Sequence, residues 1–187
     1  MSSTKTNPGR TNQKLYFAKL QQEVLEQALA AGGFDAEPKA LSAREAVIFH
    51  LHGAYLSFLQ ELCRFYKLPL SLSSSEALRE AMAAKGQVSP EVTLLQQWEG
   101  EGGHWLAELQ GAHRATLQAA EAVSASPEDD GDELETPAPA TKLIQEIRLV
   151  PTDADLPLSE PDLARLKHWH QSLTQAIREF RSEMAEW

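Results

Sequence analysis

The chain has 187 residues, of which 42% are hydrophobic and 24% charged, and its formal net charge is −10. This length is enough for one domain with a single core. The acidic excess argues against nucleic acid and membranes as partners, since phosphate backbones and anionic lipids are bound by clustered Lys and Arg. The single cysteine, Cys63, excludes an internal disulfide and a cysteine metal site.

The first ten residues are polar and contain a turn signal at Asn7-Pro8-Gly9, so residues 1–10 are expected to form a flexible tail. They lack the apolar stretch of a secretory signal. The most apolar later stretch, residues 46–68, is interrupted by ionisable side chains and is not expected to cross a membrane. We therefore expect a cytoplasmic protein.

Residues 11–123 are predicted to form a helical bundle. The first helix begins at Thr11 or Asn12 and ends at Gly32-Gly33. Its core-facing stripe is expected to consist of Phe17, Leu20, Val24, Ala28 and Ala31, which recur at helical spacing.

The second helix is predicted to be the centre of the bundle. Residues 34–41 are expected to form a loop, after which the capping box from Ser42 to Glu45 opens a helix that ends at Leu68, before Pro69. Apolar residues cover so much of the circumference of this helix that other helices must surround it.

Two further helical stretches follow in the bundle. A short helix is predicted between Ser73 and Gly86, and Ser89-Pro90 provides an N-cap and a first-turn proline for the next one. The apolar register of that helix continues across the glycines at 100, 102 and 103 to Thr116. This pattern indicates a kink or a break between two stacked segments.

The end of the chain is predicted to contain a linker and a last helix. Residues 124–141 contain six acidic residues and three prolines, so they are expected to be a disordered acidic linker. Residues 142–150 are interpreted as an extended segment. The last helix begins near Ser159, and its heptad-like seam is formed by Leu163, Leu166, His170, Leu173, Ile177, Phe180, Met184 and Trp187.

A seam of this length needs a partner. Within residues 142–187, the last helix is expected to pack back on the bundle of the same chain, or alternatively against a second copy. The fold class predicted from the whole pattern is all-α, an antiparallel helical bundle of four to five main helices with one short extended segment.

Helical bundles often hold di-metal centres, whose ligands include Glu-x-x-His pairs on the helices. The spacing Glu-x-x-His occurs once, at Glu101 and His104, and a di-metal centre needs two such pairs. His50 and His52, like His168 and His170, are two residues apart and point to different sides of a helix. We therefore expect no metal and no cofactor.

One pair of residues matches a catalytic pattern. Arg44 and His50 have the Arg-x(4–6)-His spacing that resembles the motif of HEPN ribonucleases, which are also small helical bundles. That resemblance implies phosphoryl-transfer chemistry by the two residues in a shared cleft. However, the two positions are about 120° apart on an ideal helix, and the chain is acidic.

Several short stretches carry a second resemblance, which covers most of the chain except the acidic linker. They are similar to an uncharacterised gammaproteobacterial family, a domain of unknown function seen in pseudomonad-type genomes. The resemblance implies a bacterial, cytoplasmic helical protein and assigns no functional residues. The stretches are Thr11–Ala18, Arg44–Ala46, Phe49–Leu51, Gly53-Ala54, Tyr66–Pro69, Trp105-Leu106, Leu158-Ser159, Trp169 and Phe180-Arg181.

The sequence therefore favours a non-enzymatic helical bundle that acts through protein–protein interaction, with another protein or a second copy as the partner. Trp169, beside the seam, and Trp187, at its end, are the candidate interaction residues. The alternative is a HEPN-like ribonuclease that uses Arg44 and His50. A sensor that binds a small molecule between helices is a third class, for which no residues are assigned.

Overall fold

The computed structural model describes residues 9–32, 35–124 and 160–186, and these residues form six helices and no strand. The all-α prediction is therefore confirmed for the described residues. The predicted extended segment, residues 142–150, lies outside them, as does the acidic linker after Ser124, the last residue of α5. The helices are α1 (Gly9–Ala31), α2 (Ala36–Phe65), α3 (Ser75–Ala83), α4 (Pro90–Gly100), α5 (Trp105–Ser124) and α6 (Glu160–Ala185).

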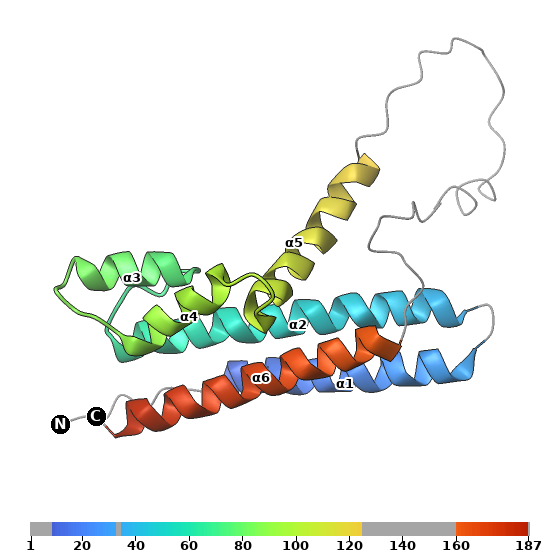
Figure 1. Cartoon of the computed structure of the whole chain (residues 1–187), viewed down its shortest axis with the longest axis horizontal. Coiled ribbons are helices and arrows are strands. Elements are labelled where there is room, and N and C mark those ends of the chain that lie inside the picture. Colours follow the sequence, from blue (N-terminus) through green and yellow to red (C-terminus); the bar gives the residue numbers. More distant parts are fainter. Residues whose placement is uncertain (1–8, 33–34, 125–159, 187) are drawn as a thin grey trace, which may run out of the picture.

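The three longest helices lie side by side, as Figure 1 shows: α1 and α2 run antiparallel, and α6 packs against both. The shorter helices α3 and α4 and the beginning of α5 cover another side of α2 (Figure 1). The central position predicted for the second helix, α2, is confirmed, because its residues Leu51, Tyr55 and Phe58 are almost completely buried. None of the described helices combines the length and the apolar content that crossing a bilayer requires.

The start of α2 differs from the prediction. The helix begins at Ala36, so the expected loop over residues 34–41 is wrong, and Ser42 lies inside the helix rather than at its N-cap. Asp35 is the N-cap, and Pro38 lies in the first turn, where its missing N–H would have no intrahelical acceptor in any case. The helix ends at Phe65, three residues before the predicted end, and Lys67 follows with a φ of +54°.

The buried face of α1 also differs from the prediction. The residues of α1 that face α2 and α6 include Leu15, Ala18 and Leu25, whereas Leu20 and Val24 are exposed. Gln22 is buried, and its Nε2 donates a hydrogen bond to the backbone oxygen of Leu166 at 3.1 Å. Because a buried polar side chain is tolerated where it has a partner, the helix can bury this face and leave Leu20 and Val24 outside. Of the predicted stripe, Ala28 is buried.

The glycine-containing segment after α4 is a break, as predicted. Ser89 caps α4, with its Oγ accepting from the backbone N–H of Val92 at 3.1 Å. The helix ends at Gly100 and α5 begins at Trp105, with Gly103 between them at a φ of +85°. The short helix predicted between Ser73 and Gly86 is α3, which is capped by Ser74.

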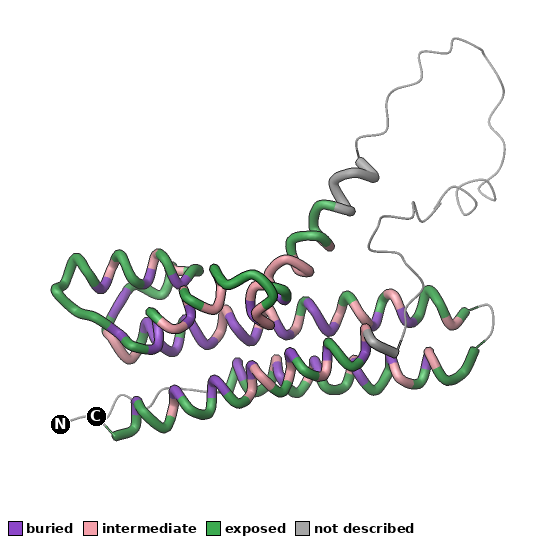
Figure 2. The backbone as a smooth tube through the Cα atoms, in the orientation of Figure 1, coloured by how far each residue is buried: buried purple, intermediate pink, exposed green. Residues whose placement is uncertain are grey.

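The seam of α6 faces the other helices. Its leucines, Ile177, Phe180 and Met184 are buried, and the inner faces of the long helices are correspondingly purple in Figure 2. The ring of Phe180 stacks at 5.8 Å from both Phe58 and Trp98. His170, at a half-buried seam position, has its Nε2 3.1 Å from the backbone oxygen of Leu15, the carbonyl partner expected of a core histidine. Trp187, the last seam position, lies outside the described residues.

Candidate functional site

The outer face of α1 is an exposed apolar stripe made of Tyr16, Leu20 and Val24. These residues follow at intervals of four and therefore share one side of the helix. Their exposed fractions are 58%, 37% and 44%. Phe49 of α2 is also 58% exposed, and the ammonium of Lys14 on α1 lies 4.6 Å from the centre of its ring. The stripe is on the opposite side of α1 from the core residues, so α1 is apolar on two sides.

Charge is distributed unevenly along α1. Its basic residues, Arg10, Lys14 and Lys19, are all in the N-terminal half, and its acidic residues, Glu23 and Glu26, are in the C-terminal half. Lys19 and Glu23 are exposed and flank the outer face. Two antiparallel copies of this helix would therefore place opposite charges beside each other.

The structure does not bring Arg44 and His50 to one site. Both are half-buried on α2, about 9 Å apart along the helix axis and about 120° apart around it. His50 faces α1, where its Nδ1 lies 3.5 Å from Lys14 Nζ and its ring lies 5.4 Å from Phe17. Burial, and then the charges of Lys14 and Arg10, lower the pKa of His50. This geometry gives no support to a shared catalytic cleft.

The side chain of Trp169 is buried between α6 and α5. It is 3% exposed, and its Nε1 donates a hydrogen bond to Glu108 Oε2 at 3.0 Å. The guanidinium of Arg165 lies 5.7 Å from the centre of its ring. Trp169 therefore serves the packing of this chain. Trp187, the second interaction residue proposed from the sequence, lies outside the described residues.

The remaining candidates for chemistry are held in packing contacts. The ring of His104 stacks on Trp98 at 5.2 Å, and its Nδ1 accepts from the backbone N–H of Leu106. Cys63 is fully buried, and burial raises the pKa of its thiol. Among the described residues, no three His, Cys, Asp or Glu side chains are grouped so that they could hold a metal ion.

A cleft of about 330 Å³ opens where α2, α4 and α5 meet the segment that precedes α3. Among the described residues, its charged lining side chains are Glu99 and Arg114. We call it the α2–α5 cleft. It is lined by His52, Tyr55 and Leu56 of α2, Ser73 and Ser74 before α3, Glu99 of α4, and Gln110, His113 and Arg114 of α5.

The carboxylate of Glu99 is the centre of a hydrogen-bond network in this cleft. The hydroxyl of Tyr55 donates to Oε1 and the hydroxyl of Ser75 donates to Oε2. Gln110 Nε2 donates to Oε1 at 2.8 Å. Burial and the neighbouring carboxylate of Glu99 raise the pKa of Tyr55, which keeps its hydroxyl protonated as a donor. The network joins one residue from each of α2, α3, α4 and α5.

Two stacked imidazole rings form the wall of the cleft between α2 and α5. The rings of His52 and His113 are 3.7 Å apart and inclined by 12°. Burial, followed by the effect of His113, lowers the pKa of His52 to about 4, and burial also lowers the pKa of His113. Both rings are therefore neutral at pH 7, which allows them to stack without charge repulsion.

The fold and these surfaces can be compared with known proteins. A model of DUF6586, a family of unknown function, matches residues 1–187. The chain belongs to this family. No curated protein and no solved structure matches it. The match agrees with the resemblance to an uncharacterised domain, while the bacterial origin that the resemblance implies stays a prediction.

In this DUF6586 protein, the α2–α5 cleft could not be found from the sequence. Its residues come from three helices and the segment before α3, and from positions as distant as 52 and 113, with no spacing that a short motif could encode. The sequence offered one local signal, which is that Glu99 and Gln110 are polar residues in helices predicted to pack against others. In the structure both side chains are half-buried, and polar side chains in such positions need hydrogen-bond partners.

Proposed function

We propose that this protein acts through protein–protein interaction, and that the outer face of α1 is its contact surface. The observation that carries the proposal is the apolar character of both sides of α1, of which the core uses one. Single exposed apolar residues are ordinary, but Tyr16, Leu20 and Val24 form a continuous stripe. Helix faces with this spacing are the usual docking surface of a partner helix.

We propose that the partner is a second copy of the chain, paired antiparallel about Leu20. In this arrangement Tyr16 faces Val24 of the other copy, and Leu20 faces its counterpart. Lys19 of each copy then lies beside Glu23 of the other. Tyr16, Leu20 and Val24 form a ridge of residues four apart, and two such ridges pack into each other at a crossing angle of about −50°. Helices that cross at this angle touch over a short length, and Leu20 lies at its centre.

Sedimentation equilibrium of the full chain tests the proposal over a range of concentrations. We expect a dimer whose dissociation constant rises at least about tenfold in Leu20→Glu, because the substitution buries a charge in an apolar contact. Leu117→Glu on α5 is the matched control. It introduces the same charge at another exposed leucine, 57% exposed against 37% for Leu20, and is expected to leave dimerisation unchanged.

Charge exchange tests the orientation. Lys19→Glu and Glu23→Lys each place like charges together and should weaken the dimer, whereas the double variant restores the opposite pairing and the affinity. A wild-type chain that stays monomeric throughout, or a Leu20→Glu chain that dimerises as tightly as wild type, contradicts the proposal. Dimerisation that responds to Leu20→Glu but not to charge exchange contradicts the antiparallel arrangement alone.

A further inference from the structure

The α2–α5 cleft has more free hydrogen-bond donors than acceptors. The acidic group in its lining, Glu99, already accepts from Tyr55, Ser75 and Gln110. Arg114 is exposed at the cleft and makes no hydrogen bond or ion pair to the other described residues. Its five N–H groups are therefore available to a ligand.

The stacked histidines add to this donor capacity. Neither His52 nor His113 uses a ring nitrogen in a hydrogen bond to the described part of the chain, and both rings line the cleft. A neutral imidazole has one N–H to donate, and a protonated one has two. The hydroxyls of Ser73 and Ser74 lie on the same lining. Ser74 Oγ accepts from the backbone N–H of Ala77, which leaves its own proton free to donate.

We infer that the α2–α5 cleft binds a small organic anion, such as a carboxylate or a phosphate monoester, through Arg114 and the edges of the His52–His113 stack. The cleft volume of about 330 Å³ is at the lower end of the range for small-molecule sites. Glu99 keeps its negative charge, but its oxygens already accept from three donors, and Arg114 supplies the positive charge that a bound anion needs. The site is independent of the outer face of α1.

Anion binding in this cleft is coupled to proton uptake. The charged and titratable groups that face the stack are Glu99 from α4, Tyr55 from α2 and Arg114 from α5. A bound anion stabilises the imidazolium form of His52 or His113, whose charge is otherwise disfavoured by burial and by the neighbouring ring. Linkage then requires that the affinity for a given ionic form of the anion increases as the pH falls from 7 toward 5.

The test uses the full chain with inorganic phosphate and succinate as separate probes and glycerol as the neutral control. Histidine imidazole NMR signals are followed during each titration, and calorimetry in two buffers of different ionisation enthalpy measures proton uptake. We expect saturable binding of at least one anion, with shifts at His52 and His113, and no saturable response to glycerol. Proton uptake should be positive at pH 6.

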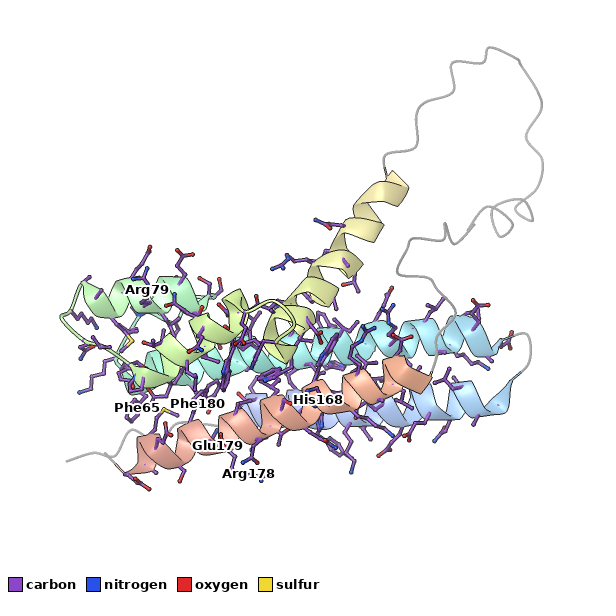
Figure 3. All side chains as sticks on the ribbon, viewed as in Figure 1. Phe65, Arg79, His168, Arg178, Glu179 and Phe180 are labelled. Carbon is purple, nitrogen blue, oxygen red and sulfur yellow. The ribbon has the colours of Figure 1, made fainter. Side chains whose placement is uncertain are left out.

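Arg114→Gln should weaken anion binding at least about tenfold, since a hydrogen bond between charged groups is lost. Arg79→Gln is the matched control, because Arg79 is an exposed arginine on α3 outside this cleft (Figure 3) and its removal changes the net charge equally. Both arginines are exposed, so neither variant is expected to unfold. Failure of both anions to saturate, or equal weakening by the two substitutions, overturns the inference. Binding without proton uptake overturns the histidine coupling.

Discussion

The guanidinium of Arg181 on α6 makes two hydrogen bonds to the carboxylate of Glu61 on α2, 120 residues earlier in the sequence. Nε lies 3.0 Å from Oε2, and Nη2 lies 2.9 Å from Oε1. The hydroxyl of Thr11 on α1 donates to the same carboxylate. Glu61 is 1% exposed, so the three longest helices meet at one buried, fully partnered charge.

Arg181→Gln should lower the free energy of unfolding by about 3 kcal/mol, because it leaves the carboxylate of Glu61 buried with less compensation. Urea denaturation measures the change. Arg165→Gln is the control: Arg165 pairs with Asp162 at 2.6 Å on the same helix but is 49% exposed, and its loss should cost less than about 1 kcal/mol. Equal losses in the two variants would contradict the structural importance of the Arg181–Glu61 pair.

The break between α4 and α5 depends on Gly103. Gly103→Ala should destabilise the protein by about 1 kcal/mol, because φ is +85° there and a side chain is strained in that conformation. Gly102→Ala is the control. The neighbouring glycine has no positive φ, and a Cβ at either position would meet no atom within 4 Å. Thermal unfolding that shows equal effects at both positions would mean that backbone conformation is not the cause.

Stability should fall as the pH decreases from 7 toward 4. The pKa of His52 is about 4 in the folded chain, compared with its ordinary 6.5, so between these values the unfolded chain binds a proton that the folded chain does not. The unfolded state therefore gains stability on acidification until the pH falls below the folded pKa. Allowing for solvent screening of a partly exposed ring, His52 should contribute about 1–2 kcal/mol.

Urea denaturation at pH 7 and pH 5 measures this dependence. His52→Phe keeps an aromatic ring against His113 but cannot be protonated, so its loss of stability between the two pH values should be smaller than that of wild type. The control is His168→Phe on the exposed side of α6, which should retain the wild-type dependence. An unchanged pH dependence in His52→Phe would contradict the role of the stack.

Sequence analysis predicted the helical elements well where local chemistry determines them. Ser89-Pro90 starts a helix because the serine hydroxyl accepts a backbone N–H and proline fits the first turn. The seam of α6 was predictable because its apolar spacing is nearly constant over seven turns. Ser42 failed as an N-cap because Asp35 and Pro38 had already opened the helix.

The parts that could not be predicted depend on tertiary contacts. On α1 both sides carry apolar residues at helical spacing, so periodicity alone could not select the face with Leu15 and Leu25 over the stripe with Leu20 and Val24. The burial of Gln22 becomes favourable only when α6 supplies the carbonyl of Leu166. The α2–α5 cleft could not be predicted from the sequence for the same reason. The partners of Glu99 are determined by the packing of the helices rather than by spacing along the chain.

The aromatic contacts of Phe180 offer the sharpest test of how α6 is held. Figure 3 places Phe180 on the side of α6 toward α2 and α4, whereas Arg178 and Glu179 point away. Its ring is 3% exposed and stacks on those of Phe58 and Trp98. Phe180→Ala should therefore lower the free energy of unfolding by about 3–5 kcal/mol, since it removes buried apolar surface and leaves a cavity.

Phe49→Ala separates this effect from a general loss of aromatic surface. Phe49 is 58% exposed and contacts Lys14 and His50, so its removal should cost less than about 1 kcal/mol. Near-ultraviolet circular dichroism should also change in Phe180→Ala, because Trp98 loses one of its two stacking partners and keeps only His104, and stay near wild type in Phe49→Ala. If the two variants were equally stable, α6 could not be packed against α2 and α4 through Phe180. The three-helix meeting point at Glu61 would then have to hold α6 in place without that aromatic contact.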